Sequence, residues 1–250
     1  MSNHLYNYLL RLGDTNLILS HRLSENCSKG PYLEEDLAIA NTGLDLLGAS
    51  EQFLMYAAEV SDEDITADDL AYKRLETKFY NLQLAEQPNT DFGYIMARQF
   101  LMDVYNFYLY KELSNSKDEK ISAIAVKSLK EVTYHMRRSS EWIIRLGDGT
   151  EESHNRIQRA LNDMWFYTKE IFEMDETDKA MLELGIGADL SKVKTSWENK
   201  IDEILAIATL EKPNLEFFAF GSKQGIHTEH LGYLLAEMQY LPKFYADAKW

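Results

Sequence analysis

The sequence predicts an all-α fold in which long helices form a bundle and shorter helices lie at its ends. Three observations support this. Apolar residues recur at spacings of three and four along several long segments, which is the pattern of one helix face. The prolines, at positions 31, 88, 213 and 242, fall between these segments. No alternation of apolar and polar residues is long enough to predict a strand.

The length and composition favour one domain. A chain of 250 residues that is 45% hydrophobic can bury a sizeable core. No low-complexity tract or linker divides the chain. We therefore expect residues 1–250 to form a single domain.

The first two helices are predicted for residues 3–26 and 33–60, with a turn at Gly30-Pro31 between them. The first helix is amphipathic, with leucines at three-to-four spacing. The second is apolar nearly all round, so we expect it to lie centrally in the bundle rather than on its surface. Asp45 belongs to the thin polar stripe of the second helix, among several leucines.

Two further helices are marked by side chains that can cap them. Thr66-x-x-Asp69 predicts the start of a helix that ends near Glu86. Asp91 predicts the start of a mostly apolar helix over residues 92–113. Asp103 is the only acidic residue in the interior of that helix.

The longest helix is predicted from Ser116 to Gly147, a length of about 45 Å at 1.5 Å per residue. Ser116-x-x-Glu119 has the spacing of a capping box, and Gly147 can end the helix in a left-handed turn. Glu131 and His135 are four residues apart and therefore lie on one face. Later helices are predicted for about 151–174, 192–210 and 224–241.

Charge and cysteine content limit the functions to consider. The formal net charge is −15, from 41 acidic against 26 basic residues. This charge repels phosphate backbones and anionic lipids, so we expect neither nucleic acid nor a membrane as a partner. Cys27 is the only cysteine, which excludes an internal disulfide. No signal peptide or membrane-spanning segment is predicted, and we expect a cytoplasmic protein.

A helical bundle with inward carboxylates and a histidine raises the question of a di-iron site. Such a site uses a Glu from each of two helices and a Glu-x-x-His motif from each of the other two. Only Glu151-x-x-His154 has that spacing, and it lies at a predicted helix start, where we expect it to be exposed. The motif is therefore not present as the required pair.

Asp45, Asp103 and Glu131 remain as one acidic residue on each of three central helices, with His135 beside the last. In one interpretation they form a buried polar cluster, paired with Lys, Arg, His or Tyr, in place of a metal site. In the other they form an atypical metal site with a shifted Glu–His pair. The sequence favours the first interpretation, and we assign no catalytic, cofactor or metal residue.

Several segments together resemble a known family. They are LRLGDTNLILSHRL, DLAIANTGLDLLG, AEQPNTDFGYIMARQF, EVTYHMRRSSEWIIRLGDGTEES and GIHTEHLGYLLAEMQYL. They are similar to the PaaC-type subunit of bacterial phenylacetyl-CoA epoxidases, and the similarity covers nearly the whole chain. The last segment is long enough to be specific.

The resemblance implies a ferritin-like fold and membership of a cytoplasmic multicomponent monooxygenase. That enzyme epoxidises the ring of phenylacetyl-CoA at positions 1 and 2 in aerobic phenylacetate catabolism. A homologous partner subunit holds the di-iron centre, and a reductase with flavin and an iron–sulfur cluster supplies electrons from NADPH. The PaaC-type subunit holds no cofactor; it pairs with and supports the catalytic subunit. The resemblance therefore gives no catalytic residue to this chain.

Two other functions stay open at this point. The chain could itself be a di-iron oxygenase with atypical ligands, in which case replacing Asp45, Asp103 or Glu131 would abolish iron binding. It could also be a stand-alone helical binding module without an oxygenase partner. Purification with and without the neighbouring oxygenase subunit, followed by iron counting, separates these alternatives.

Overall fold

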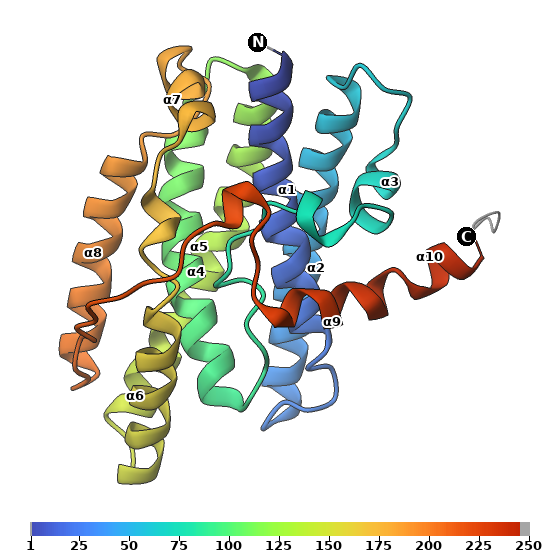
Figure 1. Cartoon of the computed structure of the whole chain (residues 1–250). Helices are drawn as coiled ribbons and strands as arrows, with labels where there is room; N and C mark the ends of the chain where they lie inside the picture. The colour runs from blue at the N-terminus through green and yellow to red at the C-terminus, as the bar shows by residue number, and fades with distance from the viewer. Residues whose placement is uncertain (1, 246–250) are drawn as a thin grey trace.

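A computed structural model describes residues 2–245 (Figure 1). Four long helices form the bundle: α1 (Ser2–Ser24), α2 (Leu33–Glu59), α4 (Phe92–Leu113) and α5 (Glu119–Gly147). α1 packs along α2, and α4 packs along α5. The connection from α2 to α4 returns along the bundle, so these two helices run in the same direction (Figure 1). One long crossover of this kind is typical of ferritin-like bundles, and the expected all-α, ferritin-like fold is confirmed.

Shorter elements surround the bundle. They are α3 (Ala67–Tyr72), η1 (Glu76–Lys78), α6 (Glu151–Trp165), η2 (Glu170–Phe172), α7 (Glu176–Glu183), α8 (Leu190–Ile207), η3 (Ser222–Gln224), α9 (Glu229–Met238) and α10 (Tyr240–Phe244). α6 and α8 cover α4, while α9 lies against the front of the bundle with buried leucines and α10 extends away from it (Figure 1). Within residues 2–245, none of the helices combines the length and apolarity needed to cross a bilayer.

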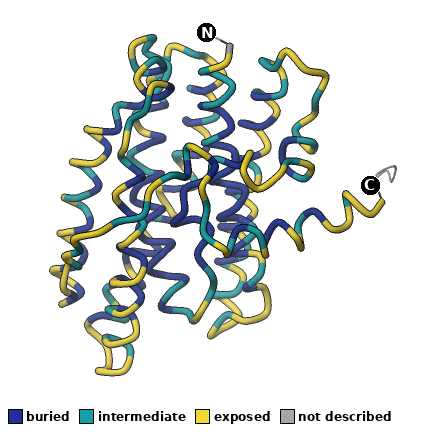
Figure 2. Tube along the Cα trace, in the orientation of Figure 1, coloured by how far each residue is buried: buried dark blue, intermediate teal, exposed yellow. Residues whose placement is uncertain are grey.

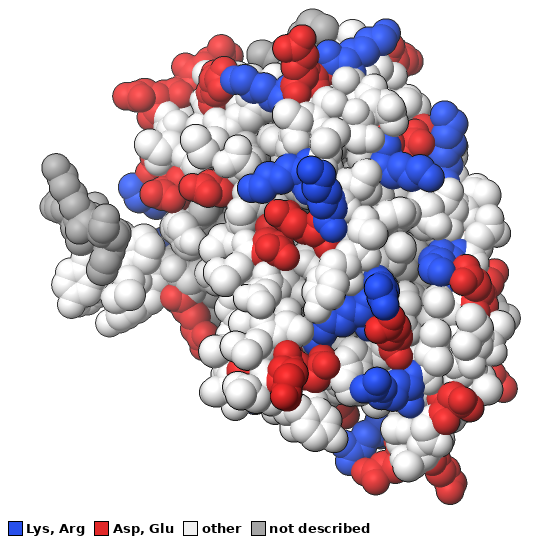
Figure 3. All heavy atoms as spheres, turned by 180° about the vertical axis from the view of Figure 1, so that it is seen from behind, with Lys and Arg blue, Asp and Glu red and all other residues white. Residues whose placement is uncertain are grey.

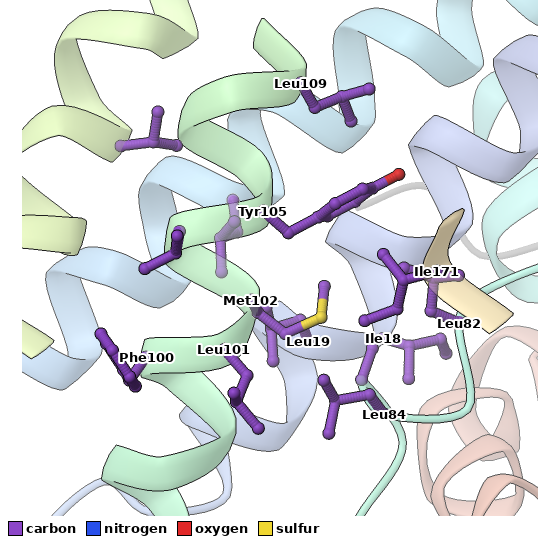
Figure 4. Packing of buried hydrophobic residues seen from close by; sticks show 14 of the residues in the cluster. Ile18, Leu19, Leu82, Leu84, Phe100, Leu101, Met102, Tyr105, Leu109 and Ile171 are labelled. Atoms are coloured by element: carbon purple, nitrogen blue, oxygen red, sulfur yellow. The ribbon is translucent and has the colours of Figure 1, made fainter. Parts of the chain in front are cut away.

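The buried core is centred on α4. Figure 2 shows the dark blue, buried trace concentrated in the middle of the bundle. Met102 and Tyr105 of α4 lie on the side of Ile18 of α1 and Leu84 of the connecting segment, while Phe100 is buried on the other side of α4 (Figure 4). α4 is covered by α5, α6 and α8 as well as by this segment. It is therefore the helix that apolar residues bury on almost every side.

α2 is not the central helix that its apolar sequence predicts. α1, α5 and α3 are the main elements that pack on it. Leu46 is buried, but its neighbours Leu44 and Leu47 are exposed. The prediction that α2 lies centrally in the bundle was therefore wrong for the isolated chain. An apolar residue pattern on all sides of a helix predicts burial, but it does not show which elements of the chain cover each side.

Local signals placed several helix starts correctly. Asp91 caps α4 by accepting a hydrogen bond from the N–H of Tyr94, and Thr66 and Asp69 form a capping box at α3. The box predicted at Ser116 is wrong. Asp118 caps α5 instead, accepting from the N–H groups of the first helical residues, while the Ser116 hydroxyl donates to a distant carbonyl.

Gly147 does end α5, but not by a left-handed turn, because its φ is not positive. A Cβ at this position would lie 2.3 Å from the carbonyl oxygen of Ala208. Glycine is therefore required by the close approach of the chain after α8.

The helix predicted to continue from Thr66 to Glu86 ends at Tyr72. The following segment has its backbone satisfied by side chains from elsewhere in the chain. The N–H of Tyr80 donates to Asp14, and the N–H of Gln83 donates to Glu170. Buried backbone groups need partners, and these tertiary partners replace the local hydrogen bonds of a helix. α6 likewise ends at Trp165, earlier than predicted, and the last predicted helix is divided into α9 and α10.

Candidate functional site

The four polar residues singled out in the sequence lie on three neighbouring helices of the bundle. Asp45 is on α2, Asp103 is on α4, and Glu131 and His135 are on α5. Asp45 and His135 are in direct contact. Asp103 and Glu131 are both close enough to His135 for its charge to affect their pKa values.

His135 and Asp45 join α5 to α2. The Nε2 atom of His135 lies 2.9 Å from Oδ2 of Asp45. The His135 side chain is 1% exposed and that of Asp45 is 39% exposed, so the pair runs from the interior to the surface. The hydroxyl of Ser139, one turn later, donates to the carbonyl of His135 at 3.0 Å.

Asp103 is the buried carboxyl group of the site. Its Oδ1 accepts a hydrogen bond of 2.7 Å from Nε2 of Gln99, one helical turn earlier. Among the described residues, Oδ2 of Asp103 and Nδ1 of His135 have no hydrogen-bond partner. Burial raises the pKa of Asp103 to about 6, against the opposing effect of His135. The carboxyl group can therefore take up a proton near neutral pH.

Glu131 lies at the edge of the site and is partly buried. Burial raises the pKa of its carboxyl group, and the negative charge of Asp45 raises it further. The ammonium group of Lys127 and the imidazole of His135 oppose this effect. Glu131 and Asp45 thus repel each other across the edge of the site.

These residues do not fit a di-iron centre. Such a centre in a helical bundle needs four carboxylates and two imidazoles that converge on two metals. Within residues 2–245, no three His, Cys, Asp or Glu side chains are grouped so that they could hold a metal ion. His135 already uses Nε2 for Asp45. What the arrangement can do chemically is hold and exchange protons.

Glu151-x-x-His154, the one sequence match to the iron motif, lies at the start of α6. Nδ1 of His154 is 2.8 Å from the carbonyl oxygen of Gly147, at the end of α5. Glu151 is exposed, as predicted. His154 therefore contacts the end of the preceding helix.

The sequence did not indicate a second buried cluster, formed by Glu86 and His227. Nδ1 of His227 lies 3.0 Å from Oε2 of Glu86, and Nε2 lies 2.8 Å from the carbonyl oxygen of Phe79. The N–H of Thr228 donates to the other oxygen of Glu86. The two side chains come from segments far apart in the sequence, so no spacing could have predicted the pair.

A groove of about 430 Å³ lies between α2 and α5. Glu35 of α2 accepts a hydrogen bond of 2.8 Å from the indole Nε1 of Trp142, and it also pairs with Arg138. Arg145 lies over the Trp142 ring. The groove is therefore lined by aromatic side chains and arginines, which are enriched at protein interfaces, and by carboxylates, which are depleted there.

Comparison with known proteins gives two matches over essentially the full chain. The model of the phenylacetic acid catabolic protein family matches residues 1–250. One of the subunits of the 1,2-phenylacetyl-CoA epoxidase of Escherichia coli (strain K12), the one designated C, is 45% identical over 248 residues. The match covers 99% of this chain and 100% of that protein.

Proposed function

The chain belongs to the phenylacetic acid catabolic protein family, and we propose that it is a non-catalytic structural subunit of a phenylacetyl-CoA 1,2-epoxidase. In this function it pairs with the homologous oxygenase subunit, which holds the di-iron centre and acts on the ring of phenylacetyl-CoA. A separate reductase supplies electrons from NADPH through flavin and an iron–sulfur cluster. The complex serves aerobic phenylacetate catabolism.

The observation that carries this proposal is the similarity to one subunit of the Escherichia coli epoxidase, at 45% identity over 99% of the chain. Because the two chains match over their full lengths, the comparison involves the same kind of subunit and not a shared fragment. The family alone does not separate a catalytic from a structural subunit.

The donor set of the bundle supports the structural role. Asp45 and His135 are hydrogen-bonded to each other, and Asp103 is bonded to an amide. Buried polar groups with partners of this kind add to the specificity of a bundle without binding a substrate. An oxygenase with atypical ligands would need the same side chains to turn toward a metal.

The test is to purify the chain alone and together with the oxygenase subunit of the same complex, and to measure iron and epoxidation of phenylacetyl-CoA. We expect the chain alone to lack stoichiometric iron, and the pair to contain about two irons and to depend on both chains for full activity. The Asp103→Ala variant should leave the iron content of the pair unchanged. Two irons in the chain purified alone would contradict the proposal.

A further inference from the structure

A small cavity lies between α1 and α4, and its volume is about 40 Å³. α1 packs mainly along α2, and α4 packs along α5, so the cavity lies where the two helix pairs of the bundle meet. Tyr105 projects from α4 to the side of Leu82, and both residues line the cavity (Figure 4). None of the four polar residues of the candidate site lines it. The cavity is therefore a separate feature of the bundle.

Two buried asparagines line the cavity, Asn16 of α1 and Asn106 of α4. Nδ2 of Asn16 donates to the carbonyl oxygen of Leu12 at 2.8 Å and to the hydroxyl of Tyr110 at 2.9 Å. Among the described residues, Oδ1 of Asn16 and Nδ2 of Asn106 have no hydrogen-bond partner. A buried polar atom without a partner costs about 1–3 kcal/mol. This acceptor and this donor call for a ligand that can both donate and accept hydrogen bonds.

Two hydroxyl groups at the cavity can also donate. The hydroxyl of Tyr8 accepts a hydrogen bond of 3.1 Å from the N–H of Ala188, and that of Thr15 accepts one of 3.2 Å from the N–H of Leu82. A hydroxyl that accepts a hydrogen bond still has its own proton to donate. Burial raises the pKa of Tyr8, so this hydroxyl stays protonated at neutral pH. An acceptor inside the cavity would satisfy both protons.

The charged side chains beside the cavity balance one another. Arg11 pairs with Asp175 and Asp178, and Lys223 pairs with Asp178. Two positive and two negative groups leave no net charge to attract an ion. Acidic and basic side chains also lie close to one another on the back of the molecule (Figure 3), so no strong field of one sign concentrates ions there. The ligand that fits the cavity is therefore uncharged.

The volume of the cavity selects a ligand of the size of water. A water molecule needs about 10–15 Å³ of cavity volume and occupies about 30 Å³ in the liquid. A cavity of about 40 Å³ therefore holds about one to three waters, whereas pockets for metabolites measure about 300–1,000 Å³. Cavities that stay dry and take up xenon are lined by apolar side chains. This cavity has the amides and hydroxyls described above.

We infer that the cavity between α1 and α4 is a binding site for about one to three ordered water molecules. Together the waters donate to Oδ1 of Asn16 and accept from Nδ2 of Asn106 and from the hydroxyls of Tyr8 and Thr15. An internal water makes about three hydrogen bonds, which these groups can supply. Because the groups belong to α1 and α4, the waters join one helix pair of the bundle to the other. This inference does not depend on the proposed function.

The test is a high-resolution crystal structure of the full chain, followed by a structure of the same crystals under xenon pressure. We expect density for at least one water at about 2.7–3.2 Å from the amides or hydroxyls of the cavity, and no bound xenon. Asn106→Leu replaces the amide with an apolar group that branches in the same way, and it should lose at least one of these waters. Oxygen-17 magnetic relaxation dispersion, which counts long-lived internal waters in solution, should show the same loss.

Asn26→Leu is the matched control. Asn26 is also buried and its Nδ2 also has no partner among the described residues, but it does not line the cavity. Cavity waters in the wild type and in Asn26→Leu, with their loss from Asn106→Leu, support the inference.

Four results overturn the inference. Xenon in the wild-type cavity shows that the cavity is dry, and a wild-type cavity without density shows that it binds nothing. An ion, identified by its anomalous signal, contradicts an uncharged ligand. Unchanged waters in Asn106→Leu show that its amide is not a ligand of water. The wild-type structure decides the inference even where a variant fails to fold.

Discussion

His227 and Glu86, 141 residues apart in the sequence, have side chains that are both fully buried and 3.0 Å apart. The second ring nitrogen of His227 faces the carbonyl oxygen of Phe79. A carbonyl only accepts hydrogen bonds, so this nitrogen carries a proton. Below the raised pKa of His227, the first nitrogen also carries a proton and donates it to the Glu86 carboxylate, and the ring is then positively charged. The pair fixes the segment before α9 to the segment after η1.

We expect the His227→Ala variant to be less stable than the wild type by about 3–5 kcal/mol at pH 6, because it leaves a buried carboxylate without its partner. Chemical denaturation followed by circular dichroism measures this difference. His230→Ala is the control, since no hydrogen bond of the His230 ring contributes to the pair. A loss of less than about 1 kcal/mol would show that the pair contributes no more than an exposed one.

The same pair gives a pH dependence with a defined direction. Burial alone lowers the pKa of His227, but Glu86 raises it above the ordinary value of 6.5. A raised pKa means that the stabilisation is complete below pH 6.5 and is lost as the pH rises through the higher pKa of the folded state. The stability difference between wild type and His227→Ala should therefore shrink in alkaline solution. A difference that grows with pH would contradict a charged imidazole.

For Asp103 we expect the charged form to destabilise the fold, whereas for His227 the charged form stabilises it. Its pKa is raised from 3.8 to about 6 by burial. Ionisation of this carboxyl group therefore lowers the free energy of unfolding progressively as the pH rises from about 4 to 6. Above pH 6 the loss reaches at most about 3 kcal/mol.

We expect Asp103→Asn, which retains the acceptor for Gln99, to increase the free energy of unfolding at pH 7 by about 1–3 kcal/mol. The variant should have little effect at pH 4, where the wild-type carboxyl group is protonated in the folded state. Urea unfolding at both pH values measures this. If Asp103→Asn destabilises at pH 7, then Asp103 is held as a carboxylate by a partner.

The parts of the fold that the sequence predicted are those set by local chemistry. Asp91 caps α4 with its own side chain, and Glu131 and His135 share a helix face because they are four residues apart. The end of α3 could not be predicted, because the carboxylates of Asp14 and Glu170 accept hydrogen bonds from the backbone N–H groups of residues 80 and 83. Such contacts depend on tertiary structure.

The candidate site shows the same division. The sequence indicated which residues are unusual for their surroundings, and the structure joins Asp45 to His135 across two helices. The sequence did not indicate that Asp103 is hydrogen-bonded to Gln99, or that Glu86 contacts His227. Glu86 and His227 are far apart in the sequence and follow no recognisable spacing, so only folding brings them into contact.

Two glycines give a matched pair of predictions about packing. Gly147 and Gly48 both lie in helices, but their surroundings differ. A Cβ at Gly147 would lie 2.3 Å from a backbone oxygen of Ala208, whereas a Cβ at Gly48 meets nothing within 4 Å.

We expect Gly147→Ala to destabilise the chain by about 1–3 kcal/mol, because the backbone must move. Gly48→Ala should stabilise it by about 0.5–1 kcal/mol, because alanine restricts the unfolded chain and favours the helix. Thermal unfolding of both variants measures the two effects, and a stabilising Gly147→Ala would show that the loop after α8 does not lie against the end of α5.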